Sequence, residues 1–268
     1  MALIELATVK KDYDQARRLV RNALKFNPGN HSLLVVQART ELGAEQFTTA
    51  AKLAESILKT NPNSADARGV LVSAALASRD RGILDRALES VAGAIEKTPK
   101  NPGLHLINTR ILVAMDKSEA AISELEVFGK TKAGKQNKAV LLVLVRLLRK
   151  KGDFAKADRW LALASKASGQ NDREVLMARM RLCGQQGKYE EVISLANKAN
   201  STEKPDLIVL GAAALLQLVR TCGKLNDCDA ARKHLADALA IDAKSKVLTD
   251  RQRREIADIL KSLPAKST

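Results

Sequence analysis

The sequence predicts an all-α solenoid, a stack of helix pairs in which each pair contacts only its neighbours. A pattern of two amphipathic helices recurs about every 34 residues, which is typical of helical repeat proteins. Apolar residues make up 46% of the chain but aromatic residues only 3%, and the Ala- and Leu-rich remainder suits closely packed helices. Proline follows several of the predicted second helices, where it stops a helix.

The most regular copy of the pattern is residues 31–64. Apolar residues at helical spacing predict a first helix over 32–42 and a second over 48–59, and Asn61-Pro62 ends the second. Ala50 and Ala54 lie on one face of the second helix. Two helices of this length cannot bury a core alone, so the pair depends on its neighbours.

Seven such repeats follow one another. In six of them the second helix carries an alanine that lets two helices cross closely. In three of these an aromatic residue lies three positions before the alanine, as in Tyr13 with Ala16 and Phe154 with Ala157. A short insertion near 79–82 lengthens the third repeat, and a loop over 129–137 replaces the terminal proline of the fourth. The predicted repeats are residues 1–30, 31–64, 65–101, 102–137, 138–171, 172–206 and 207–245.

Residues 246–268 differ from the repeats. A helix is predicted over 249–263, and we expect it to cap the seventh repeat, with a frayed tail from Pro264 onward. Its apolar stripe is Ile256, Ile259, Leu260 and Leu263. The N-terminal end shows no such cap. We therefore expect the first helix to begin at or before Met1, the chain to be a segment of a longer repeat protein, and this open end to be able to self-associate.

Three segments match the pattern of a known repeat family: 12–16 (Asp-Tyr-Asp-Gln-Ala), 152–157 (Gly-Asp-Phe-Ala-Lys-Ala) and 187–191 (Gly-Lys-Tyr-Glu-Glu). Through them the chain resembles the tetratricopeptide repeat (TPR) family, as a divergent array of bacterial type, over nearly its whole length. The early Trp, Leu-Gly and Tyr of the family's first helix are mostly missing. The resemblance implies a right-handed superhelix of helix pairs, plus the C-terminal capping helix, with the first helices lining a concave groove.

We expect no catalysis, no metal and no cofactor. His31, His105 and His234 do not lie at ligand spacing from one another or from a cysteine. Nucleophile-elbow, Walker and dinucleotide-binding signatures are missing in their required strand context. Cys183 is interpreted as a small core residue and Trp160 as a packing residue.

The sequence does not identify the cellular compartment of the protein. No stretch has the length and apolarity of a membrane span. Met1 leads directly into Ala-Leu-Ile-Glu, without the basic region or cleavage site of a signal peptide. The three cysteines form no disulfide framework, although Cys222 and Cys228 could pair. The sequence is compatible with the cytoplasm or, for a chain cut from a longer protein, the periplasm.

The net charge of +15 favours anionic partners, although a solubility effect would give the same excess. The implied geometry points the ninth residue of each first helix into the groove, and four of these residues are arginines. In the fifth repeat, spacings of four, four and three place a lysine, a leucine and two arginines on one helix face. The alternative is a solvated face whose charges are screened. The candidate groove residues are Arg39, Arg110, Lys138, Arg146, Arg149 and Arg181.

These observations predict a non-catalytic scaffold that binds a protein or peptide partner of acidic character in its concave groove. The alternative is a binder of an acidic polymer, such as a polysaccharide in an export or envelope system, which Ala- and Leu-rich arrays of this style resemble. Nucleic acid is disfavoured because stacking aromatics are scarce and none falls regularly on the groove face.

Overall fold

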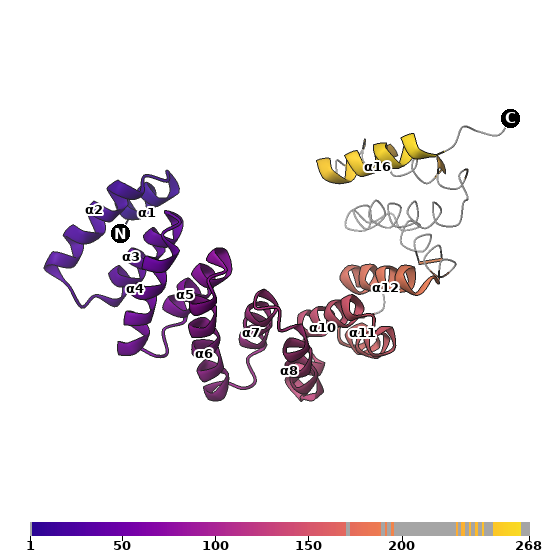
Figure 1. Cartoon of the computed structure of the whole chain (residues 1–268), viewed down its shortest axis with the longest axis horizontal. Coiled ribbons are helices and arrows are strands. Elements are labelled where there is room, and N and C mark those ends of the chain that lie inside the picture. Colours follow the sequence, from indigo (N-terminus) through magenta and orange to yellow (C-terminus); the bar gives the residue numbers. More distant parts are fainter. Residues whose placement is uncertain are drawn as a thin grey trace. The chain divides into compact units, whose positions relative to one another are not determined.

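In a computed structural model, the chain is described over residues 2–169, 172–188 and 249–263, with a few scattered residues between 191 and 243. The described part holds thirteen helices and no strand (Figure 1). The predicted all-α solenoid is confirmed. The chain divides into two compact bodies, an N-terminal body, Met1–Gly134, and a C-terminal body, Lys135–Thr268.

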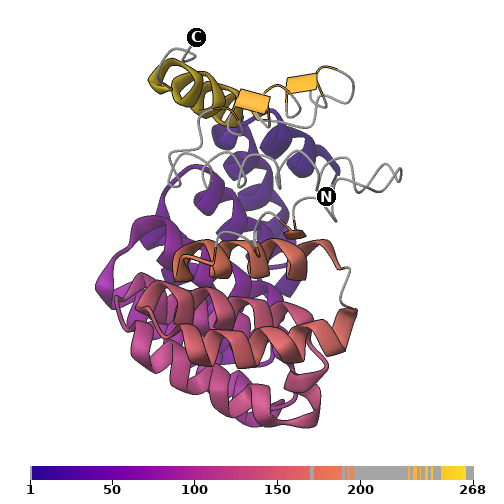
Figure 2. The same cartoon turned by 90° about the vertical axis from the view of Figure 1, so that its right-hand side faces the viewer.

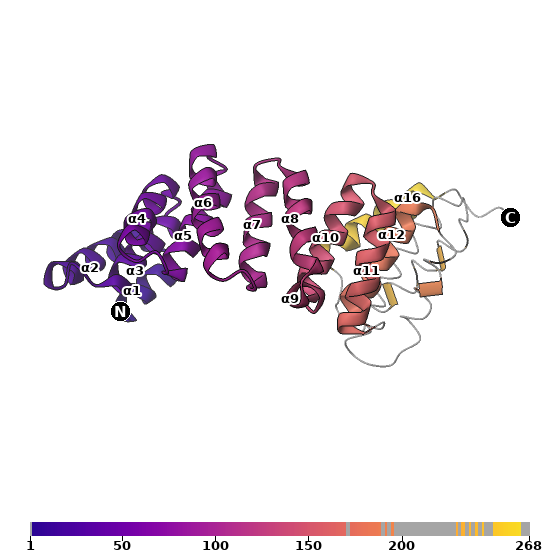
Figure 3. The ribbon, with the colours of Figure 1, turned by 90° about the horizontal axis from the view of Figure 1, so that it is seen from below.

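The N-terminal body is a stack of antiparallel helix pairs, and Figure 3 shows the pairs following one another along the chain. Each helix packs against the next, and the first helices α3, α5 and α7 also contact one another in turn. The helices are α1 (Ala2–Val9), α2 (Tyr13–Phe26), α3 (His31–Gly43), α4 (Phe47–Thr60), α5 (Ala65–Ser78), α6 (Arg81–Lys97), α7 (Pro102–Ala114) and α8 (Ser118–Lys130).

The C-terminal body continues the pattern with α10 (Lys138–Lys151), α11 (Phe154–Ser168) and α12 (Arg173–Gln186). The helix α10 packs against both α11 and α12, and the three lie side by side in the pink and orange part of Figure 2. Within the described ranges, none of the helices has the length and apolarity needed to span a membrane.

The last described helix is α16 (Asp250–Ser262), within the segment predicted for the cap. Ile256 is buried, Ile259 is half-buried and Leu260 is 39% exposed. The seventh predicted repeat lies almost entirely outside the described residues, as do His234 and the cysteines that could pair, Cys222 and Cys228. The capping role of α16 therefore stays a prediction.

Polar side chains fix where the first helices begin. Each accepts a backbone N–H of the first turn, which would otherwise lack a partner inside the helix. In the fifth repeat, for example, Asn137 accepts the N–H of Val140 at 3.0 Å. The capping residues of these helices are Asn30, Ser64, Asn101, Asn137 and Asp172.

The small residues of the second helices lie at the centre of the packing. None of five equivalent alanines has any exposed surface. The contact between repeats is equally close, because a Cβ on Gly43 would lie 2.8 Å from Cε1 of Tyr13. The helices therefore approach at distances that admit only Ala or Gly. The alanines are Ala16, Ala50, Ala87, Ala121 and Ala157.

Two segments that depart from the regular repeat pattern form helix in the structure. The insertion of the third repeat lengthens α6 to 17 residues, against 14 in α4. The prediction of a loop over 129–137 is wrong for most of its length, because α8 continues to Lys130 and α9 (Lys132–Lys135) follows. The Thr131 hydroxyl donates to the Phe128 carbonyl at 2.6 Å and accepts the Gly134 N–H at 3.1 Å, which ties this turn together.

We expect Ala157→Leu to lower the free energy of unfolding by about 1–3 kcal/mol, because extra methyl groups must displace helices that already touch. Ala155→Leu, on the exposed side of the same helix, is the matched control and should change stability by less than about 0.5 kcal/mol. Urea unfolding of both variants measures the difference. Equal stabilities would contradict the close-approach interpretation.

The turns inside the repeats place one residue in the left-handed region. In the first four repeats it is a non-glycine residue, as in Arg79 (φ 55°), whereas the fifth uses Gly152 (φ 86°). Arg79→Gly should raise stability by about 0.5–1 kcal/mol and Gly152→Ala should lower it by about 1 kcal/mol, since only glycine adopts this backbone freely. Thermal unfolding checks both signs. A Cβ at Gly152 has open space, so a loss there reports the backbone and not a clash.

Candidate binding groove

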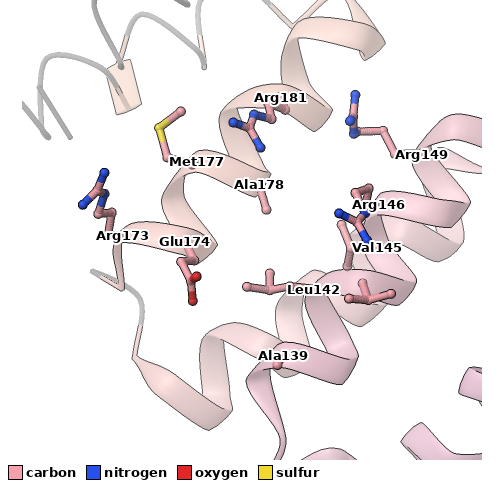
Figure 4. Close-up of a pocket in the computed structure, with 11 residues that line it drawn as sticks. Ala139, Leu142, Val145, Arg146, Arg149, Arg173, Glu174, Met177, Ala178 and Arg181 are labelled. Carbon is pink, nitrogen blue, oxygen red and sulfur yellow. The ribbon is translucent and has the colours of Figure 1, made fainter. Parts of the chain in front are cut away.

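A hollow of about 800 Å³ lies between α10 and α12 of the C-terminal body, and Figure 4 shows the side chains that line it. Its size is in the range of protein sites for small ligands or peptide side chains. Part of the lining is apolar and part is charged. The lining residues are Ala139, Leu142, Val143, Val145, Arg146, Arg149, Arg173, Glu174, Met177, Ala178 and Arg181.

Helical periodicity explains why the arginines face the hollow. On α10, the buried leucines Leu141, Leu144 and Leu148 have at most 1% of their surface exposed and fix the core side of the helix. Arg146 and Arg149 lie on the other side, three residues apart. Their guanidinium groups and that of Arg181 on α12 lie around the same opening (Figure 4).

Positive charge dominates this hollow. Four arginines line it, against one carboxylate, that of Glu174. Burial, followed by the charges of Arg181 and Arg146, lowers the pKa of Arg149. The Arg149 Nη1 donates to Oε1 of Gln185 at 2.9 Å, and this neutral amide does not offset its charge. An anion bound here would therefore relieve repulsion as well as form new contacts.

Arg146 and Arg181 are exposed, and neither forms an ion pair within the part of the chain that the structure describes. The Glu174 carboxylate is bonded instead to Lys138, 2.6 Å from its Nζ. The arginines thus face the hollow without a neutralising partner among the described residues.

Lys138 is placed differently from the other candidates on α10. It is not among the lining residues, and its Nζ also lies 3.0 Å from Oδ2 of Asp172. Hydrogen bonds to Glu174 and then Asp172 raise the pKa of Lys138. Asp172 in turn accepts the N–H of Val175 at 3.2 Å and caps α12. Lys138 therefore joins the start of α10 to the start of α12.

The remaining two candidates lie in the N-terminal body and do not line this hollow. Arg39 on α3 is bonded through Nη2 to Oδ1 of Asp66 at 2.6 Å, and both side chains are largely exposed. Arg110 on α7 is exposed. A continuous ladder of arginines along the whole chain stays a prediction.

The sequence reasoning did not single out Arg173, Glu174, Met177 or Ala178 as groove residues. A signal was available, because Arg173, Met177 and Arg181 repeat the spacing of Lys138, Leu142 and Arg146 thirty-five positions later. The spacing of four on both first helices brings the two sets to facing sides of one hollow.

The other chemically notable side chains are structural. Cys183 is buried, and burial raises its thiol pKa to about 11, so it stays protonated and unreactive. His105 is also buried, where its ring nitrogens bond Glu124 Oε1 and the Pro99 carbonyl at 2.9 Å each. Its ring stacks on Phe128, with ring centroids 3.9 Å apart. The described residues contain no group of His, Cys, Asp and Glu side chains that could hold a metal ion.

The geometry defines a class of protein: a helical-repeat protein with an open basic groove and, among its described residues, no metal site. No family model and no curated protein matches the sequence. Solved structures do match in fold. PilW, a widely conserved type IV pilus biogenesis factor, has a TM-score of 0.55 and 14% identity, over 85% of this chain and 99% of PilW.

A tetratricopeptide repeat protein from Parabacteroides merdae has a TM-score of 0.53 and 14% identity, over 97% of this chain and 95% of that one. The Cut9–Hcn1 hetero-tetramer of the APC/C has a TM-score of 0.51 and 14% identity, over 94% of this chain and 47% of the matched chain. This chain therefore spans about half the length of that match. Identities this low show the fold alone. The chain has the tetratricopeptide-repeat fold, as the segments 12–16, 152–157 and 187–191 predicted.

We expect Lys138→Met to lower the free energy of unfolding by about 1 kcal/mol at neutral pH, an amount reduced by the partial exposure of the lysine. Burial raises the pKa of Asp172, but bonds from Lys138 and from the N–H groups of Val175 and Glu174 lower it more, so the net pKa is below its ordinary value. A carboxylate with a depressed pKa contributes stability above its unfolded pKa and loses it as pH falls through the folded value.

The wild type should therefore exceed Lys138→Met in free energy of unfolding by the full amount near pH 7, and this difference should shrink as pH falls below about 4. Lys150→Met, an exposed lysine on the same helix, is the control. Thermal unfolding of the three proteins across this pH range measures the effect. A difference between wild type and Lys138→Met that did not change with pH would contradict a role for the ionised Asp172.

Proposed function

We propose that the chain is a non-catalytic scaffold that binds an acidic segment of a protein partner in the hollow between α10 and α12. The observation that carries this proposal is the charge of the lining: four arginines, and a single carboxylate that Lys138 already bonds. Surface hollows normally mix charges of both signs, because like charges repel. An excess of this kind favours a partner that supplies the missing negative charge.

The side chains suit a carboxylate better than a point-like anion. A guanidinium presents parallel N–H donors that can grip both oxygens of an Asp or Glu side chain. Leu142, Met177 and Ala178 lie among the arginines and offer apolar contact. We therefore expect a peptide in which acidic residues are interspersed with apolar ones, lying in extended or helical form between the two helices.

The structural matches supply limited support for a protein partner. Cut9 is seen in a hetero-tetramer with Hcn1, and PilW is a pilus biogenesis factor. Both share only the fold with this chain. A repeat array with an open groove offers an extended surface that is suited to binding a partner.

A second candidate ligand is an acidic polymer, such as a polysaccharide. The net charge of +15 favours it, because a long polyanion could contact many cations outside the hollow. The two candidates differ in salt dependence. Binding that rests on many exposed charges is screened by salt, whereas a peptide with apolar contacts keeps part of its affinity.

The test is charge reversal at the two facing arginines, Arg146→Glu/Arg181→Glu. The probe is a fluorescein-labelled dodecapeptide of alternating glutamate and leucine, and fluorescence anisotropy measures its affinity. We expect at least about tenfold weaker binding, since two attractive contacts become repulsive. The charge-matched control, Arg18→Glu/Arg159→Glu, alters exposed arginines on α2 and α11 and should bind like the wild type.

Equal affinity of the wild type and of Arg146→Glu/Arg181→Glu would contradict the proposal. An alginate oligosaccharide serves as the second probe. The acidic polymer would be favoured instead if alginate bound more tightly than the peptide near 0.15 M NaCl and its affinity fell steeply with added salt.

A further inference from the structure

A second hollow, of about 470 Å³, lies in the N-terminal body at α4, α5 and α6. Figure 3 shows these helices, with α5 packing against both α4 and α6. The lining is apolar at Leu58, Pro62, Leu71 and Ala94, and most of its other residues are charged, with both signs present. This hollow shares no residue with the one between α10 and α12.

Arg68 is the arginine of this hollow that lacks a charged partner among the described residues. Its Nη2 donates to the Pro62 carbonyl at 2.6 Å and its Nε to the Ser90 carbonyl at 3.2 Å. These two bonds fix the guanidinium in place without neutralising it. Burial lowers the pKa of Arg68, and the described residues provide it with no ion pair. Arg86 on the same hollow differs, because it pairs with Glu55 at 2.5 Å.

Gly93 is the second unusual feature of the lining. It lies inside the helix α6, where glycine costs about 1 kcal/mol relative to alanine. Packing within the chain does not require it, because no atom lies within 4 Å of the position that a Cβ would occupy. A glycine at such a place leaves room for the close approach of another backbone.

We propose that this hollow is a second peptide-binding site, where a partner segment sets one side-chain carboxylate on Arg68 while its backbone crosses Gly93. Held by two carbonyls, the guanidinium keeps further N–H donors for that carboxylate. Gly93 lets the backbone approach the wall of the hollow, and Leu58 and Pro62 contact apolar side chains beside the acidic residue.

The rim defines the class of peptide. Glu89 and Glu96 line the hollow together with Lys59 and Lys97, so its rim carries both signs of charge and suits a ligand with basic as well as acidic groups. The ligand is therefore a mixed-charge segment with one acidic residue between apolar and basic ones. It differs from the acid-rich segment proposed for α10 and α12, and the second site does not depend on that proposal.

The decisive variant is Gly93→Leu, which fills the hollow and replaces glycine by a better helix former. The matched control is Gly69→Leu. Gly69 is likewise inside a helix with open space at its Cβ, but it does not line the hollow. The probe is a fluorescein-labelled nonapeptide with one central aspartate, flanked by leucine and alanine, and a lysine near each end. Its counterpart has asparagine in place of the aspartate.

We expect Gly93→Leu to bind the nonapeptide at least about tenfold more weakly than wild type, and Gly69→Leu to bind it equally well. Arg68→Met, and the asparagine peptide on the wild type, should each lose about tenfold because the ion pair is missing. Arg146→Glu/Arg181→Glu should leave this binding unchanged. Thermal unfolding of Gly93→Leu, expected at or above the wild-type temperature, shows that the variant is folded.

The second site is overturned if Gly93→Leu binds like the wild type, or if the wild type does not bind the nonapeptide at about 1 mM. Loss of nonapeptide binding in Arg146→Glu/Arg181→Glu with retention in Gly93→Leu would also overturn it, because the peptide would then occupy the other hollow. Failure of the glutamate-rich probe at α10 and α12 concerns only the first proposal.

Discussion

The close approach of neighbouring helices at small residues is the constraint on which this structure depends. Alanines such as Ala50 and Ala157 have no exposed surface, and Gly43 admits the ring of Tyr13 where a side chain would clash. A solenoid has no central core to compensate for a poor contact, so each pair must fit its neighbours. This repeated fit brings successive first helices side by side, as seen for α3 with α5 and for α10 with α12.

The two candidate binding surfaces lie on the helix faces that do not pack against neighbouring helices. On α10, the leucines occupy the core side, so the other side is free to carry Arg146 and Arg149 at little cost to the fold. The hollow at α4, α5 and α6 instead combines the guanidinium of Arg68, which has no carboxylate partner among the described residues, with both lysines and carboxylates on its rim. The peptides that we propose for the two hollows therefore differ, one rich in acidic residues and one of mixed charge.

Polar groups at the helix ends contribute more to the architecture than the charge pattern indicated. Asp172 caps α12 and also bonds Lys138. Lys138, which the sequence predicted to contact ligand, therefore joins the first helices α10 and α12 at one end of the hollow. Arg68 similarly links the turn at Pro62 to α6 through Ser90. In both cases a cation positions helices, but only Arg68 does so without a carboxylate.

The sequence by itself determined the repeat architecture, because helical periodicity, small residues and helix stops are local signals. It also placed Arg146 and Arg149 on one helix face, since spacing along a single helix fixes that. Only the tertiary structure decided which partners meet: Lys138 with Asp172, thirty-four positions on, and Arg68 with Gly93 in one hollow. Such pairings depend on the register of one helix against the next, which side-chain packing sets and which spacing along the chain does not contain.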